Sequence, residues 1–170
     1  MEEILRAGFA ELGLPLDAEA LRRFRSYYEY LTERNREMNL TAIAGEEQTA
    51  RLHFLDCCAL LAAADFTRRR VIDVGSGAGF PGLPLKIASP GMDITLLDSL
   101  GKRTDFLRSA ARLLGLDGVT VVCARAQEAP PGLRAGVPLA ASPPAARPHI
   151  PRPHACPPLP PRAAALPRRA

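Results

Sequence analysis

The sequence predicts an α/β fold in which a parallel, Rossmann-like sheet follows a region of helices. Apolar residues recur at helical spacing in residues 1–65, whereas short apolar runs alternate with helical segments in residues 66–128. A glycine-rich turn follows the first of these runs. Strands and helices that alternate in this way form parallel sheets through right-handed crossovers. We therefore expect an N-terminal helical region at 1–65 and a partial sheet domain at 66–128.

Helical periodicity is clearest in residues 1–13 and 17–38. Asp17 is suited to cap the second segment, because its carboxylate can accept a hydrogen bond from a free N–H group of the first turn. The expected apolar face of this segment is formed by Leu21, Phe24, Tyr28 and Leu31. A third helix is expected at 46–64.

From residue 71 onward the period changes to that of alternating strands and helices. We expect strands at 71–75, 93–98 and 119–123, joined by helices at 82–88 and 102–114. This makes an incomplete sheet of about three strands.

The pattern stops in residues 129–170, here called the tail. The tail holds 13 of the 17 prolines and no acidic residue, and it has few apolar side chains to offset the entropy of ordering. We expect it to be disordered, rich in Pro, Arg and Ala. Because the change falls in the middle of the predicted fold, we interpret the tail as the product of a shifted reading frame near residues 126–132. The alternative is a genuine Pro/Arg-rich interaction segment.

Charge and composition narrow the functional classes. The net charge is +4, but the tail contributes six arginines, so residues 1–128 carry about −2 and show no basic nucleic-acid footprint. No apolar run reaches the ~18 residues of a membrane span, and the N-terminus lacks a basic signal-peptide region. The four cysteines lack paired metal-ligand spacing. We expect a cytoplasmic monomer with no metal and no membrane partner.

The most informative segment is residues 71–82, Val-Ile-Asp-Val-Gly-Ser-Gly-Ala-Gly-Phe-Pro-Gly. We call its last part, residues 75–82, the glycine loop. Glycine permits positive φ and close approach of a ligand to the backbone, so such a loop after a strand is typical of nucleotide-like ligands. Asp73 precedes the loop and Asp98 ends the second apolar run. These two carboxylates favour a ligand with a ribose and a cationic or polar tail over a bare phosphate.

Two cofactor classes fit this segment. The spacing Gly77-x-Gly79-x-x-Gly82 satisfies the dinucleotide fingerprint, which leaves an NAD-dependent oxidoreductase open. The acid at Asp73 argues against it, because a carboxylate near the glycines repels a diphosphate. Asp-x-Gly-x-Gly-x-Gly after an apolar strand is the pattern of class I S-adenosylmethionine-dependent methyltransferases, whose Rossmann-like sheet is the fold we expect.

Four segments together resemble one family. Asn-Leu-Thr-Ala-Ile at 39–43, His-Phe-Leu-Asp at 53–56, the run at 73–82 and Leu-Leu-Asp-Ser-Leu-Gly-Lys-Arg at 96–103 occur in that order. They are similar to the bacterial 16S ribosomal RNA guanine-N7 methyltransferases, also called glucose-inhibited division protein B. The resemblance implies methyl transfer from S-adenosylmethionine to guanine N7 in small-subunit ribosomal RNA, the expected partner. It covers about three-quarters of this chain and about half of a family member.

The resemblance also implies a set of cofactor-binding residues. Gly75 and Phe80 would line the methionine and adenosine pocket, Asp98 would take the ribose hydroxyls, and Ala126 with Gln127 would lie beside the adenine. The whole expected cofactor-binding set is Asp73, Gly75, Gly77, Gly79, Phe80, Asp98, Ala126 and Gln127. We name no catalytic acid or base, because guanine N7 carries a free lone pair and the transfer needs only orientation.

Six cationic or titratable side chains are candidate RNA contacts: Arg34, Arg36, Arg51, His53, Lys102 and Arg103. Each of them can also be interpreted as a solvated surface charge. For His53 the alternative is a histidine on a helix surface that is bonded to a neighbour.

The family continues beyond residue 128 with a fourth strand and a Ser-Arg-Ala segment that supplies a cofactor-site arginine, and neither is recognisable in the tail. We therefore expect the first strand to lack a neighbour on one side, which leaves an exposed edge. We also expect this chain to fold poorly and methyl transfer to be impaired. A third class stays open, in which a non-enzymatic, cofactor-binding adaptor displays the Pro/Arg tail to a partner.

Overall fold

The structure is a computed structural model that describes residues 1–42, 45–128 and 137–139. Its elements, in chain order, are α1 (Glu2–Glu11), α2 (Ala18–Met38), α3 (Glu46–Thr49), the π-helix η1 (Ala50–Leu55), α4 (Asp56–Ala63), β1 (Arg70–Val74), α5 (Gly82–Ala88), β2 (Asp93–Asp98), α6 (Gly101–Leu113), β3 (Val119–Cys123), the 3₁₀-helix η2 (Ala126–Glu128) and β4 (Val137–Leu139). Apart from residues 137–139, the predicted tail lies outside the described residues.

The N-terminal helices form as the sequence predicts. Asp17 caps α2, since its carboxylate accepts a hydrogen bond of 2.7 Å from the backbone N–H of Ala20. The buried face of α2 contains Tyr27 where Tyr28 was expected: Tyr27 is fully buried and Tyr28 is only half-buried. Tyr27 is drawn inward because its hydroxyl donates to the carbonyl of Ala78, a contact that helical periodicity alone does not reveal.

The third predicted helix is continuous but not uniform. It runs through α3, η1 and α4, and its middle part is a π-helix. π-helical turns are uncommon, and they occur mostly at functional sites. This one carries His53 and Phe54, which both contact the ring of Phe80 in the glycine loop.

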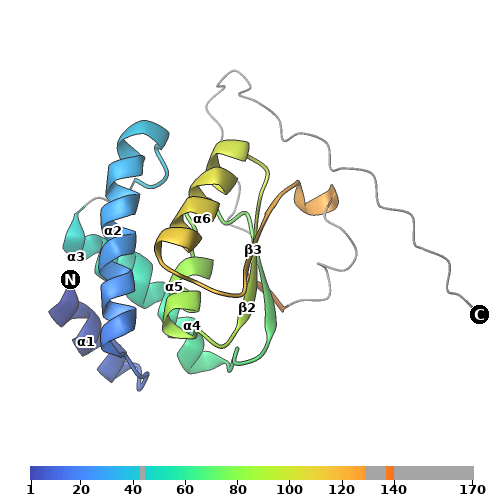
Figure 1. Cartoon of the computed structure of the whole chain (residues 1–170). Helices are drawn as coiled ribbons and strands as arrows, with labels where there is room; N and C mark the ends of the chain where they lie inside the picture. Colours follow the sequence, from blue (N-terminus) through green and yellow to red (C-terminus); the bar gives the residue numbers. More distant parts are fainter. Residues whose placement is uncertain (43–44, 129–136, 140–170) are drawn as a thin grey trace, which may run out of the picture.

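The strands form one parallel sheet in the order β3–β2–β1–β4. Figure 1 shows α5 and α6 between α2 and the sheet, as expected when successive right-handed crossovers move in one direction. The glycine loop follows β1 and the Asp98 carboxylate ends β2, so both lie at the carboxyl edge of the sheet. The predicted α/β fold class is confirmed.

The two faces of the sheet bury different amounts of apolar surface. On the helix-covered face, Val71, Ile94 and Leu96 join the main core, which also takes in the aromatic rings of the N-terminal helices. On the opposite face, Ile72 and Leu97 form a small separate cluster. The N-terminal helices therefore share one core with the sheet and are not a separate unit.

The prediction that the first strand lacks a neighbour is wrong. β4 lies parallel to β1 and pairs Val71 with Val137 and Asp73 with Leu139, in a segment that the sequence assigns to the tail. Pro138 has no N–H to donate, and a proline is tolerated at an edge strand because one side of such a strand needs no ladder donor. In the described part of the sheet β4 is such an edge. The high proline content is the reason why the sequence did not predict this short strand.

The described residues contain neither a membrane-spanning helix nor a cluster of metal-ligating side chains. No helix there is long and apolar enough to cross a membrane. No group of three or more His, Cys, Asp or Glu side chains in that part of the chain could hold a metal ion.

Candidate functional site

The glycine loop is attached to the ends of two strands by its own backbone. The N–H groups of Gly75 and Ser76 both donate to the carbonyl of Leu97 in β2, at 2.7 and 3.1 Å. Gly75 and Gly77 have φ of +81° and +56°, a region that side-chain-bearing residues avoid. The turn therefore needs glycine here to follow this path.

Asp98 joins the loop to the end of β2. One carboxylate oxygen accepts from the N–H of Gly77 at 2.9 Å, and the other accepts from the N–H of Leu100 at 2.9 Å. A guanidinium nitrogen of Arg103 lies 3.7 Å from the first oxygen. Each carboxylate oxygen can accept more than one hydrogen bond, so Asp98 is fixed in place and still able to accept from a ligand hydroxyl.

Asp73 lies beneath the loop and is buried, with 1% exposure. One carboxylate oxygen accepts from the N–H of Gly82 at 3.1 Å, and the other has no hydrogen-bond partner among the described residues. Burial raises the pKa of this carboxyl to about 7, although the Gly82 hydrogen bond acts against the shift. Asp73 thus holds the start of α5 and keeps one polar atom free inside the site.

The space around the glycines shows which part of the loop can approach a ligand. A Cβ built on Gly75 would meet no atom within 4 Å. On Gly79 it would lie 2.5 Å from Leu83 and 2.8 Å from the Tyr27 hydroxyl. The loop is therefore open at Gly75 and packed against protein at Gly79.

Phe80 follows the packed part of the loop and takes part in a cluster of rings. The His53 imidazole stacks on it with centroids 4.2 Å apart and an angle of 5° between the planes. The rings of Tyr27 and Phe54 also lie beside the Phe80 ring, with centroids 5.7 and 6.2 Å from its centroid. The predicted cofactor residue Phe80 is thus held by the N-terminal helices.

His53 is bonded to a neighbour, as one of the two alternatives from the sequence expected. Its Nε2 lies 2.9 Å from the hydroxyl oxygen of Thr41. Burial lowers the pKa of the imidazole, and the nearby charge of Asp56 opposes that shift only in part. Burial therefore disfavours the charged form of the ring, and one face of the ring lies against Phe80.

The other RNA candidates are spread over the surface. In α2, Arg34 lies 3.6 Å from Glu37, and in η1 Arg51 bonds to Glu47 at 3.1 Å. Arg36 is exposed in the last turn of α2. For Arg34 and Arg51 these ion pairs within one helical segment favour the alternative of a surface charge.

Besides His53, which packs on the glycine loop, two RNA candidates lie at the carboxyl edge of the sheet. Lys102 is exposed and Arg103 is half-buried in the first turn of α6, next to Asp98. The third predicted strand also reaches this edge, since the N–H of Ala124 donates to the Asp98 carbonyl at 3.1 Å. Ala126 and Gln127 follow in η2 and are exposed.

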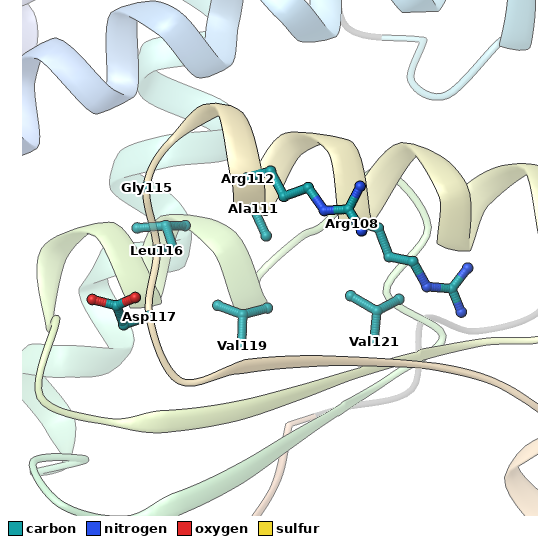
Figure 2. A pocket seen from close by; sticks show the side chains of 8 residues that line it. All are labelled: Arg108, Ala111, Arg112, Gly115, Leu116, Asp117, Val119 and Val121. Carbon is teal, nitrogen blue, oxygen red and sulfur yellow. The ribbon is translucent and has the colours of Figure 1, made fainter.

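A pocket of about 440 Å³ lies elsewhere, between the C-terminal half of α6 and β3. Figure 2 shows Val119 and Val121 projecting from β3 towards α6, with Arg108 and Arg112 along the helix above them. None of the predicted cofactor residues lines it. We therefore do not assign the cofactor to this pocket.

Sequence reasoning missed Tyr27, the residue that supports the loop most directly. Its hydroxyl donates to the Ala78 carbonyl at 2.5 Å, across 51 residues of sequence. The tyrosine stands in an ordinary amphipathic helix, so no local motif marks it. Thr41, which holds His53, does lie in one of the four family segments.

Comparison with known proteins gives a consistent family. A family model described as rRNA small subunit methyltransferase G (GidB) matches residues 20–137. A relative named Ribosomal RNA small subunit methyltransferase G from Carboxydothermus hydrogenoformans is 46% identical over 127 residues, which cover 75% of this chain and 54% of that protein. Its namesake from Exiguobacterium sibiricum is 48% identical over 120 residues, or 70% and 50% of the two chains.

Among solved structures, an O-methyltransferase from Bacillus cereus in complex with SAH matches at 20% identity with a TM-score of 0.46. That match covers 71% of this chain and 49% of the other. The chain spans about half the length of the curated relatives it matches.

Proposed function

The chain belongs to the rRNA small subunit methyltransferase G (GidB) family, and from that membership we propose that it binds S-adenosylmethionine and serves methyl transfer to guanine N7 in small-subunit ribosomal RNA. One observation carries the cofactor part of the proposal. The loop after β1 and the acid that ends β2 are joined by the hydrogen bond from Gly77 to Asp98. Two adjacent strand ends thereby form one site.

The residues at this edge suit the chemistry of the cofactor. Asp98 can accept from two ribose hydroxyls, and the open space at Gly75 lets a ligand lie against the backbone. The unpartnered oxygen of Asp73 supplies a buried acceptor for a polar or cationic tail, directly or through a water. In this proposal Phe80 lies along the adenosine and methionine, and Ala126 with Gln127 lies beside the adenine.

The same geometry disfavours the dinucleotide alternative. A pyrophosphate needs free N–H groups at the start of the helix that follows the loop. In this chain the N–H of Gly82, the first residue of α5, already donates to the Asp73 carboxylate. That carboxylate occupies the position of the diphosphate and would repel it in its charged form.

When bound, S-adenosylmethionine supplies an activated methyl group on a sulfonium. The task of the protein is then positioning, because guanine N7 presents a lone pair without a proton to remove. Looped or unpaired RNA presents this atom most readily. Lys102 and Arg103 are cationic RNA candidates next to Asp98 and are suited to phosphate contacts at the rim of the site. We infer a monomeric, cytoplasmic enzyme with the helical region 1–65 ahead of the cofactor-binding region 66–128.

Equilibrium dialysis against S-adenosylhomocysteine and NAD tests the cofactor assignment. We expect saturable binding of S-adenosylhomocysteine and none of NAD. Binding of NAD alone would overturn the assignment in favour of the oxidoreductase.

The transfer itself is tested by incubating the chain with 30S subunits and methyl-labelled cofactor, then mapping the label in the RNA. Label at one guanine N7 supports the full proposal. Cofactor binding without label would restrict this chain to cofactor binding, the adaptor alternative.

A further inference from the structure

The N-terminal helices hold the glycine loop from the side opposite the sheet, at two adjacent points. The hydroxyl of Tyr27 in α2 donates to the carbonyl of Ala78. Two residues later, the ring of Phe80 stacks on His53. Both contacts join segments far apart in the sequence, and Figure 1 shows the helices that carry them packed beside α5.

The His53 ring is itself held in place. Its Nε2 is within hydrogen-bond distance of the Thr41 hydroxyl, and this contact restricts rotation of the imidazole about the bond that joins it to Cβ. Its backbone belongs to η1, a π-helix whose neighbouring residue Phe54 is fully buried in the core. A ring fixed at its polar edge and at its backbone presents a rigid face to Phe80.

Two contacts within the protein occupy one face and one nitrogen of the His53 ring, and both are groups through which a histidine can contact RNA. One ring face is covered by Phe80 in a nearly parallel stack, and Nε2 is engaged by Thr41. Burial also lowers the pKa of the imidazole, which disfavours its charged form. An RNA contact through Nε2 or through the face that covers Phe80 would have to break one of these two interactions.

We propose that His53 is a positioning residue that acts through Phe80: its ring supports Phe80 and so keeps the glycine loop in its cofactor-binding conformation. The predicted effect on cofactor affinity rests on the proposed function, because it makes a residue outside the cofactor site control how tightly the cofactor binds. The support of the loop does not depend on the cofactor and can be measured without it.

Three full-length variants test the proposal. His53→Ala removes the stack and the Thr41 contact, whereas His53→Phe keeps a ring against Phe80 and removes only the polar contact. Tyr30→Ala is the matched control, because Tyr30 stacks on Phe106 at 5.2 Å and 7° within the same helical layer but away from the loop. Each variant is examined by amide hydrogen exchange without ligand, by titration with S-adenosylhomocysteine and by thermal unfolding.

Exchange at the loop amides gives the direct readout. The N–H groups of Gly75, Gly79 and Phe80 are hydrogen-bonded within the loop or to β2, so loosening of the loop exposes them. In His53→Ala we expect exchange at these amides to rise about 3- to 10-fold relative to amides of β2, as expected for loss of an aromatic pair. In His53→Phe and Tyr30→Ala we expect a change below about 2-fold.

Affinity for S-adenosylhomocysteine should follow the same order, about 3- to 10-fold weaker in His53→Ala and restored in His53→Phe. Loop exchange equal to wild type in His53→Ala would overturn the proposal. So would an equal rise in Tyr30→Ala, which would make the effect one of general stability. If the wild type binds no S-adenosylhomocysteine, the proposed function fails, and the exchange data still decide whether His53 supports the loop.

Discussion

The ends of β1 and β2 each carry a buried aspartate, and the two carboxylates differ in their hydrogen-bond partners. Asp73 at the end of β1 is buried, and one of its carboxylate oxygens accepts a hydrogen bond from the N–H of Gly82 at the start of α5. Burial raises the pKa of this carboxyl to about 7. Asp98 at the end of β2 uses both oxygens to accept from backbone N–H groups and has the guanidinium of Arg103 nearby. Both carboxylates are buried, but Asp73 keeps one oxygen without a partner among the described residues, whereas both oxygens of Asp98 are engaged by the backbone.

The helices that follow these strands show the same contrast, since each begins with glycine. A Cβ on Gly82 would lie 2.4 Å from Leu96, 2.7 Å from the Asp73 carboxylate and 3.0 Å from Ile94. A Cβ on Gly101 would meet nothing within 4 Å. The β1 end is thus closed by close packing, whereas the β2 end leaves room. Similar strand–loop–helix patterns therefore differ in how tightly the start of the following helix is packed.

The largest effect that sharpens this comparison is expected from Gly82→Ala. The new methyl group must displace core side chains and the Asp73 carboxylate, so we expect a loss of about 3 kcal/mol or more in the free energy of unfolding. The measurement is urea denaturation followed by circular dichroism. Gly101→Ala is the matched control and should leave stability unchanged or raise it by up to about 1 kcal/mol. Equal effects of the two substitutions would contradict the contrast between the two ends.

The next effect concerns pH. The folded-state pKa of Asp73 lies above its ordinary value of 3.8, so the folded chain binds this proton more tightly than the unfolded chain does. The Asp73 contribution to stability is present below about pH 4 and is lost as pH rises towards about 7, by up to about 1.4 kcal/mol for each pKa unit.

Asp73→Asn should remove this dependence, because a neutral amide can still accept from the Gly82 N–H. Denaturation curves at pH 5 and pH 8 measure it. Relative to wild type, the variant should gain stability at pH 8. If the difference in stability between pH 5 and pH 8 is the same in the wild type and in the variant, Asp73 is ionised at both pH values. That result would weaken the distinction between the two acids.

A smaller effect is expected at the open end. Asp98→Asn replaces the charged carboxylate that is proposed to accept from the ribose hydroxyls with a neutral amide. We expect S-adenosylhomocysteine to bind about 10- to 100-fold more weakly, as expected for loss of hydrogen bonds to a charged group. Calorimetric titration provides the measurement. Asp105→Asn is the control, since Asp105 is exposed on α6 and pairs with Arg108. Its affinity should match the wild type, and a comparable loss there would point to net charge as the cause.

The smallest effect is expected from Arg103→Gln. Arg103 is about two-fifths exposed, and its guanidinium lies 3.7 Å from the Asp98 carboxylate, so it helps to orient that group only weakly. We expect affinity for S-adenosylhomocysteine to fall about 2- to 3-fold, with no change in Lys102→Gln. An unchanged cofactor affinity together with a lower salt dependence of RNA binding would reassign Arg103 to RNA.

Much of the fold was predictable from local patterns. The helices at α1, α2 and α6 and the first three strands lie within two residues of their predicted bounds, because apolar periodicity and capping act over a few residues. Asp17 caps α2 as expected for the same reason. The exception is β4, where a proline in the sequence argued against a strand and pairing with β1 outweighed it.

The candidate site was predictable in composition but not in arrangement. The glycines and both aspartates could be named because the loop motif is contiguous and Asp98 ends a recognisable apolar run. Their different roles could not, since the burial of Asp73 depends on α5 and on the helices packed above it. The family segment at 53–56 pointed to His53, but only the fold places its ring on Phe80.

The sequence by itself thus determined the order of elements, the α/β class and the chemistry of the glycine loop. These properties depend on residues close together in the chain, where periodicity and glycine spacing act directly. Only the tertiary structure decided that both aspartates are buried, that Tyr27 and His53 support the loop, and that β1 has a neighbour in β4. Those properties come from contacts across 27 to 66 residues of sequence, and such contacts form only when the helices and the sheet share one core.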